Sequence, residues 1–207
     1  MGIWEREDLG NILQWDNGPR NTSVRFKCGY CGTDTTPPQS WLSSNKNGYH
    51  ALLSVCTSCR RPSLILCFNS DILEVSPNPK MGNEVLGLPE DIEALYGEAR
   101  AATGVGAYTA AVLTARKILM HISVEKGAAT DLSFVDYVDF LDKNSFIPRD
   151  AREWVDHIRK KSNEANHEIL IMKKQDAEDL IAFTEMLLRL IYEFKFRLPK
   201  SEPDKSA

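Results

Sequence analysis

Long hydrophobic runs are missing from this sequence. No stretch approaches the ~18 consecutive apolar residues that a membrane-spanning helix needs, and the start of the chain, Met1-Gly-Ile-Trp-Glu-Arg6, contains no apolar signal core. Gly2 matches the start of a myristoylation motif, but Arg6 stands where that motif has Ser or Thr. Hydrophobic residues still make up 43% of the composition, which allows an ordinary buried core. We therefore expect a globular, cytoplasmic protein.

Motifs of the common enzyme classes are absent as well. The sequence contains no glycine-rich phosphate loop, no GxSxG nucleophile elbow and no HExxH metal motif. It also contains no evident internal repeat and no low-complexity tract. These enzyme classes and repeat architectures therefore have no support in the sequence.

Cysteine is scarce, and its count of five is odd. Four of the five form two CxxC pairs, Cys28 with Cys31 and Cys56 with Cys59. This spacing favours metal binding in a reducing compartment over a disulfide framework. Two residues between cysteines let both thiolates of one turn converge on a single ion, and two such turns complete a tetrahedral shell. The four cysteines therefore predict a bound Zn²⁺ in a zinc ribbon, and the alternative is four unrelated reduced thiols.

Four protein ligands would fill the coordination shell of the zinc ion. No position would remain for water or substrate, so we expect the metal to be structural. The four thiolates would leave the site with a net negative charge, which Lys27, Arg60 and Arg61 are placed to offset. Cys67 lies in an apolar segment, and we expect it to be a small buried hydrophobic residue rather than a fifth ligand.

The formal net charge of −4 hides an uneven distribution. Between residues 20 and 62, six cations face the single Asp34, whereas between residues 69 and 98 seven acids face the single Lys80. Such a chain is no general binder of polyanions, so any contact with nucleic acid would use a local basic patch. The alternative is that the two regions offset each other across a domain junction.

Patterning divides the N-terminal part of the chain into three segments. Residues 1–22 mix apolar and polar side chains ahead of a turn, and we predict that they form an N-terminal arm. Alternating apolar residues lead into each CxxC pair and a third apolar run follows, so residues 23–68 are predicted to form the β zinc ribbon. Residues 69–88 are rich in Pro and Gly and have little periodicity, which predicts a linker.

Helical periodicity follows from Pro89 onward. Pro suits the first helical position, and the acids after it suit the positive end of a helix. Apolar residues at helical spacing predict about five helices, the third from Asp131 to Asp142 and the fifth from near Gln175 to about Arg197. Residues 89–198 are thus predicted to form a helical domain, and the polar tail 199–207 to be disordered.

One stretch of the helical part gathers residues that carry chemistry. Arg159, Asn163 and His167 are spaced by four residues, so on a helix they rise along one side. Lys160 and Lys161 add positive charge beside them. The stripe could present an imidazole, an amide and a guanidinium to one ligand or partner. Alternatively, the Asn and His satisfy neighbouring backbone groups and the cations form a solvated face.

These features together resemble a bacterial family, the domain of unknown function 4145. The resemblance covers about residues 25–195. It is carried by the CxxC pairs, the Leu-Pro-Glu-Asp-Ile helix start, Ala115-Arg116-Lys117, Trp154 and the Arg159 to His167 stretch. It implies a zinc ribbon followed by a helical bundle similar to the HEPN superfamily. It also implies a homodimer and a role in prokaryotic phage defence or stress response.

HEPN proteins of the ribonuclease kind cut RNA without a metal, and the resemblance implies roles for three residues. His167 would transfer protons, Arg159 would hold the phosphate and Asn163 would orient one of them. Seven residues separate Arg159 from His167, more than the active motif of that family has. This spacing favours a non-enzymatic or weakly active protein that binds RNA, other nucleic acid or a partner protein, with Lys160 and Lys161 as binding residues. A metal-independent endoribonuclease is the alternative.

Overall fold

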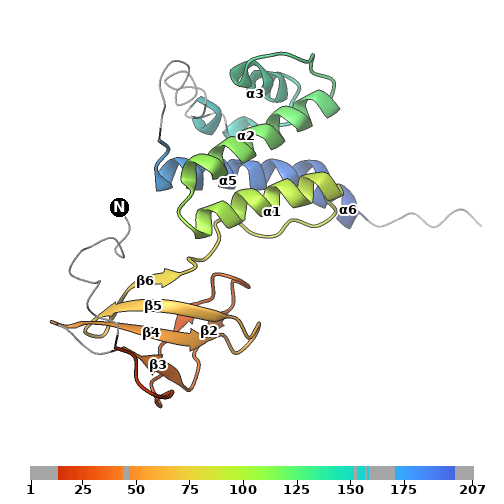
Figure 1. Cartoon of the computed structure of the whole chain (residues 1–207). Coiled ribbons are helices and arrows are strands. Elements are labelled where there is room, and N and C mark those ends of the chain that lie inside the picture. The colour runs from red at the N-terminus through yellow and green to blue at the C-terminus, as the bar shows by residue number, and fades with distance from the viewer. Residues whose placement is uncertain (1–13, 44–46, 152, 157, 159–170, 199–207) are drawn as a thin grey trace, which may run out of the picture. The chain divides into compact units, whose positions relative to one another are not determined.

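A computed structural model covers the 207-residue chain, and the structure describes residues 14–43, 47–151, 153–156, 158 and 171–198. Short antiparallel strands come first and helices follow, which confirms the predicted α+β class (Figure 1). The chain divides into two compact units. One contains the residues up to Lys80 together with Thr103–Gly106, and the other contains Met81–Ala102 and the residues from Ala107 onward.

The strand unit holds two antiparallel sheets. β1 (Phe26–Lys27) pairs with β2 (Asp34–Thr35) in a short hairpin. The larger sheet has four strands in sequence order: β3 (Ser40–Leu42), β4 (Tyr49–Val55), β5 (Pro62–Phe68) and β6 (Asp71–Ser76). β4 and β5 lie where the alternating pattern predicted strands, and their register sets Leu52 opposite Ile65.

The strand unit has its own hydrophobic core. Leu52 of β4 and Ile65 of β5 are buried in it. Cys28 and Cys56 belong to the same core and have no exposed surface, so hydrophobic packing anchors the first cysteine of each CxxC pair. Cys67 is buried too, as predicted.

The predicted N-terminal arm is described only from residue 14 onward, and its first 13 residues lie outside the described part of the chain. The described remainder runs along the edge of the large sheet. Isolated antiparallel bridges join Trp15 to Ser43 and Arg20 to Ser40. Backbone pairing therefore ties this end of the arm to the edge strand β3.

The segment 69–88, predicted to be a linker, contains regular structure. Its first part forms β6, which pairs with β5 across a β-bulge between Leu66 and Cys67. β6 is short, mostly exposed and contains charged residues. Its sequence therefore shows no clear alternation of apolar and polar side chains, which is the pattern that predicts a strand. In the second part, Val85 is buried in the core of the helices and Asn83 is hydrogen-bonded to Glu185.

The helices are α1 (Glu90–Gly104), whose last two residues belong to the strand unit, α2 (Tyr108–Glu125), α3 (Phe134–Lys143) and a long C-terminal helix in three pieces. These pieces are α5 (Lys174–Leu188), the π-helix η3 (Arg189–Glu193) and α6 (Phe194–Arg197). A 3₁₀ turn, η2 (Arg149–Ala151), precedes the helical residues 153–156. The predicted fifth helix closely matches the span from α5 to α6.

The predicted third helix begins at Asp131, whereas α3 begins three residues later. Asp131 has a positive φ of 65°, which no helix residue adopts. The hydroxyl of Ser133 accepts a hydrogen bond from the backbone N–H of Asp136 at 3.2 Å, and the Asp136 carboxylate accepts one from the backbone N–H of Ser133 at 3.3 Å. This capping box places the helix start at Phe134.

Helices α2, α3 and α5 share one hydrophobic core. Ile118 of α2, Leu141 of α3 and Ile181 of α5 have no exposed surface. Trp154 meets the ring of Phe183 edge-on, with the ring centroids 5.5 Å apart. The apolar stripes that predicted the helices are therefore the faces that the helices bury against one another.

Candidate metal centre

The first cysteine turn joins β1 to β2. The backbone N–H of Cys28 donates to the carbonyl of Thr33 at 3.0 Å, and the N–H of Gly32 donates to the carbonyl of Cys28 at 2.9 Å. Gly32 has a φ of 71°, a conformation that costs glycine nothing. These two hydrogen bonds close a tight turn, which carries Cys28 at its start and Cys31 at its outer side.

The second cysteine turn joins β4 to β5 and repeats the same geometry. The backbone N–H of Cys56 donates to the carbonyl of Arg61 at 3.0 Å, and the N–H of Arg60 donates to the carbonyl of Cys56 at 3.1 Å. Arg60 occupies the position of the glycine in the first turn and also has a positive φ, 61°. Two sequence-distant segments thus form equivalent turns that present their cysteines in the same way.

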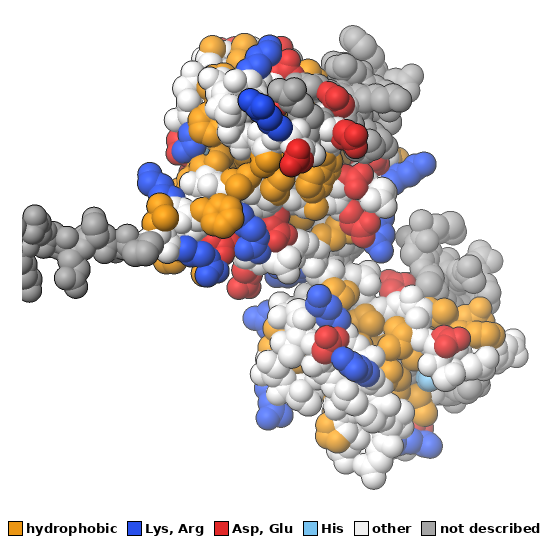
Figure 2. Space-filling view, turned by 180° about the vertical axis from the view of Figure 1, so that it is seen from behind, with side chains coloured by type: hydrophobic (Ala, Val, Ile, Leu, Met, Phe, Trp, Pro, Cys, Tyr) orange, Lys and Arg blue, Asp and Glu red, His pale blue; other side chains and the backbone are white. Residues whose placement is uncertain are grey.

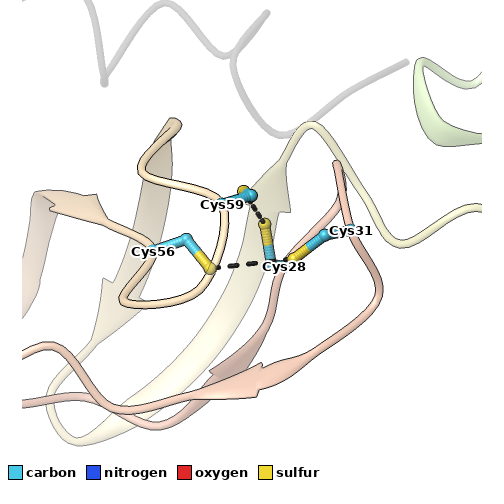
Figure 3. A group of neighbouring side chains, drawn as sticks. All are labelled: Cys28, Cys31, Cys56 and Cys59. Carbon is cyan, nitrogen blue, oxygen red and sulfur yellow. Dashed lines mark hydrogen bonds between the residues drawn. The ribbon is translucent and has the colours of Figure 1, made fainter.

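The two turns bring all four predicted ligands together (Figure 3). The Sγ atoms of Cys28, Cys31, Cys56 and Cys59 lie within 4.8 Å of one another. The Cys28 and Cys59 sulfurs are 3.7 Å apart, and the Cys31 and Cys56 sulfurs are 3.8 Å apart, so each close pair joins one turn to the other. The cluster is therefore shared between the turns rather than confined to either.

The cluster has the dimensions of a four-thiolate metal site. Metal–sulfur bonds of about 2.3 Å in a tetrahedron separate the sulfurs by about 3.8 Å, which both close pairs match. No disulfide joins these cysteines, and Cys28 and Cys56 are buried while Cys31 is exposed. The four residues could hold one metal ion between the turns.

The thiols differ in how readily they ionise. Burial raises the pKa of Cys28 to about 11. Hydrogen bonds to the side chain and then the backbone of Thr33 lower the pKa of Cys31 to about 6. The pKa of Cys56 is lowered as well: burial opposes ionisation, but the backbone N–H of Cys59 and that of its neighbour outweigh it. Two sulfurs are thus in surroundings that favour the thiolate, the form that binds metal.

Two further contacts hold the turns in place. The hydroxyls of Thr35 and Thr57 are 2.9 Å apart, and the backbone N–H of Thr57 donates to the Thr35 hydroxyl at 3.2 Å. A Cβ atom added at Gly29, inside the first CxxC, would lie 2.0 Å from the carbonyl oxygen of Pro77, so only glycine fits there. Neither contact can be predicted from the sequence, because the partners are far apart in the chain.

Exposed cations surround the cysteine turns. Lys27 precedes the first pair, where the strand register sets it opposite Asp34, and Arg60 and Arg61 follow the second pair. The guanidinium of Arg61 lies 5.3 Å from the centre of the Tyr30 ring, so a cation–π contact joins the rims of the two turns. Within the described part of the chain, no acid forms an ion pair with Arg60 or Arg61.

The remaining predicted site residues lie outside the described part of the chain: Arg159, Lys160, Lys161, Asn163 and His167. Ile158, which directly precedes them, is 5% exposed and belongs to the core of the helical unit. The roles in catalysis, in phosphate binding and in partner binding that the sequence suggests for these five residues stay predictions.

The fold and the cluster define a class: an α+β protein whose strand unit carries a four-cysteine site able to hold a metal ion. A family model described as Domain of unknown function (DUF4145) matches residues 97–205, just over half of the chain. The chain therefore belongs to this family, as the resemblance predicted. No curated protein and no solved structure matches the sequence. Within the described residues, no helix combines the length and the apolar character that crossing a membrane requires.

Proposed function

We propose that this chain is a zinc-dependent, non-catalytic protein whose strand unit binds nucleic acid. The observation that carries the proposal is the four-cysteine cluster, whose close sulfur pairs have the separations of a tetrahedral zinc shell. Tetrahedral sites of four thiolates are typical of zinc in proteins. Because the protein supplies all four ligands, the ion has no open position for a reacting water or substrate.

In this proposal the zinc ion holds the two turns together. The hairpin of β1 and β2 has only two residues in each strand, and such a short hairpin is not stable on its own. Cys28 and Cys31 come from this hairpin, whereas Cys56 and Cys59 come from the turn between β4 and β5. A shared ion cross-links the small sheet to the large one and so fixes the side chains carried on both turns.

The side chains fixed in this way suit a nucleic-acid strand. Lys27, Arg60 and Arg61 offer positive charge to phosphates, and Tyr30 exposes 36% of its surface beside Arg61. Proteins that bind single strands without sequence preference usually combine two elements: cations along the phosphate backbone of the nucleic acid and aromatic rings that stack on its bases. The acidic overall charge confines binding to this local surface.

Fluorescence anisotropy with a labelled single-stranded RNA tests the proposal on the zinc-loaded full chain. The double variant Arg60→Ala/Arg61→Ala should weaken binding about tenfold and lower the magnitude of the salt slope by about 1–2. Lys117→Ala removes an exposed cation of α2 and serves as the matched control, with affinity unchanged. Absence of binding by the wild type, or equal losses in both variants, would refute the nucleic-acid part of the proposal.

The metal-independent endoribonuclease remains the second candidate. It depends on Arg159, Asn163 and His167, and it predicts cleavage of RNA that persists in EDTA and falls by about 10²–10⁴ in His167→Ala. The binding proposal predicts no cleavage at all. The family resemblance implies two further features: a helical unit similar to HEPN proteins and a role in prokaryotic defence. Both are part of this proposal.

A further inference from the structure

The four cysteines of the cluster differ in how far solvent can reach them. Cys28 and Cys56 have no exposed surface, and Cys59 is partly exposed. Cys31, at the outer side of the first turn, is exposed. Oxidation of a cysteine requires that the oxidant reach its sulfur, so it follows exposure. An oxidant in solution therefore meets Cys31 before it meets the other three ligands.

Cations lie close to Cys31. Lys27 precedes the first cysteine pair, and the guanidinium of Arg61 lies 5.3 Å from the centre of the ring of Tyr30, the residue next to Cys31. Figure 2 shows Lys and Arg side chains spread over the strand unit. Reactive cysteines in proteins typically combine partial exposure with positive charge nearby. Cys31 has both properties.

A second sulfur lies within reach of Cys31, and it belongs to the other turn. The Cys31 and Cys56 sulfurs are 3.8 Å apart, and those of Cys28 and Cys59 are 3.7 Å apart (Figure 3). A disulfide needs its two sulfurs to approach to about 2 Å, which is a small movement for side chains on two turns. Cysteines that sense oxidants are exposed and lie next to a second cysteine that resolves the first oxidation product. Cys31 and Cys56 have this arrangement.

We propose that Cys31 is a site of reversible oxidation by hydroperoxides and that Cys56 is the cysteine that resolves it into a disulfide. The inference rests on the zinc site of the proposed function and is independent of nucleic-acid binding. The disulfide removes two of the four sulfur ligands, so the site no longer holds its ion. The strand unit thereby changes from a zinc-linked form to a disulfide-linked form.

The oxidation takes two steps. First, the sulfur of Cys31 attacks one oxygen of hydrogen peroxide, the O–O bond breaks and hydroxide leaves, so that Cys31 gives up two electrons and becomes a sulfenic acid. The thiolate of Cys56 then attacks the sulfur of Cys31, the S–S bond forms, the S–O bond breaks and a second hydroxide leaves. Each hydroxide takes a proton from the solvent. One peroxide is thus reduced to two waters for each disulfide formed.

The position of this disulfide determines what happens to the fold. A bond between Cys28 and Cys31 would join two residues of one turn and would leave the short hairpin of β1 and β2 without a link to the large sheet. The bond between Cys31 and Cys56 instead joins the turn after β1 to the turn after β4, as the shared ion does. We therefore expect the oxidised strand unit to lose zinc and to stay folded.

Hydrogen peroxide added to the zinc-loaded full chain tests the proposal. A chromogenic chelator should record the loss of zinc, and peptide mapping of the oxidised chain should find Cys31 joined to Cys56. Dithiothreitol and added zinc should then restore the starting form, because a dithiol reduces the disulfide by exchange. Cys67→Ala removes the buried cysteine of the same core, and it should give the same disulfide.

Two histidine variants separate Cys31 from the other ligands. Cys31→His and Cys59→His both retain four ligands, in the Cys₃His set that zinc accepts. Cys31→His lacks the sulfur that is attacked first, so peroxide should release its zinc at least about tenfold more slowly than that of the wild type. Cys59→His keeps Cys31 and Cys56, and its zinc should be released at the wild-type rate.

Three results would overturn the proposal: a disulfide within either CxxC pair, zinc that stays bound in peroxide, or equal rates of release from the two histidine variants. If Cys31→His fails to bind zinc, the disulfide map of the wild type decides. If the reduced wild type itself contains no zinc, the zinc part of the proposed function fails, and the same map still shows whether Cys31 and Cys56 form the disulfide.

Discussion

Glu185 accepts hydrogen bonds from both the backbone and the side chain of Asn83, which lies 102 residues earlier in the sequence. The two distances are 2.8 Å and 3.1 Å. Nearby, Arg100 of α1 donates to the carbonyls of Met81 at 3.1 Å and Gly82 at 3.2 Å. The segment before α1 is therefore held to α1 and α5 by hydrogen bonds of exposed and half-buried polar groups, and it is a structural part of the helical unit.

Replacing Glu185 by Gln should lower the free energy of unfolding by about 1–2 kcal/mol at pH 7, because hydrogen bonds to a charged acceptor are lost. Burial alone would raise the pKa of Glu185, but Asn83 and Arg189 outweigh it and hold that pKa below its ordinary value of 4.5. A carboxyl group whose pKa is lower in the folded protein stabilises the fold at pH values above its unfolded-state pKa. This stabilisation is lost as the pH falls through the folded-state pKa.

Urea unfolding of the wild type and Glu185→Gln at several pH values measures this effect. The difference in unfolding free energy between the wild type and Glu185→Gln should have its full size at pH 7 and should become smaller as the pH falls below 4.5. Glu178→Gln removes the exposed carboxylate that pairs with Lys174, and as a control it should change stability by less than about 0.5 kcal/mol. Equal effects of the two substitutions at pH 7 would contradict the role given to Glu185.

Gly29→Ala should destabilise the strand unit by about 1–3 kcal/mol, the usual cost of forcing extra atoms into a packed site. The added methyl group would meet the backbone of Pro77 and Asn78, which cannot move aside as a flexible side chain can. Gly18→Ala is the matched control, because nothing lies within 4 Å of the added atom. Thermal unfolding that is the same for both variants would show that the contact with Pro77 does not constrain the first cysteine turn.

Ser133→Ala should cost about 0.5–2 kcal/mol, since it removes the hydroxyl that caps α3. Ser133→Thr retains a capping hydroxyl and should recover most of that stability. Chemical denaturation of the three proteins provides the comparison. If Thr and Ala destabilise α3 equally, the capping box does not explain why this helix begins at Phe134.

The cysteine site could be predicted from the sequence because its information is local. Two residues between Cys28 and Cys31, and again between Cys56 and Cys59, determine which sulfurs can share an ion. The helix faces could be predicted for the same reason, since residues three and four apart pack together. The predicted start of the third helix at Asp131 is three residues too early, because the hydroxyl of Ser133 caps the helix that begins at Phe134.

The parts that could not be predicted depend on residues far apart in the chain. In the sequence, Gly29 looks like an ordinary turn glycine, and only the structure shows that the carbonyl of Pro77 lies beside it. Asn83 lies in a stretch without periodicity, and only its contact with Glu185 shows that the stretch packs on the helices.

Zinc content, measured on protein purified without added metal, tests the central claim most directly. The wild type should contain about one zinc ion per chain, and Cys56→Ser should lose the ion and unfold the strand unit while its helical circular dichroism persists. Cys67→Ala, at a buried cysteine outside the cluster, should keep the ion. A wild type that lacks zinc yet protects the backbone amides of β4 and β5 from hydrogen exchange would contradict the claim that a metal shared by the four cysteines holds this unit together.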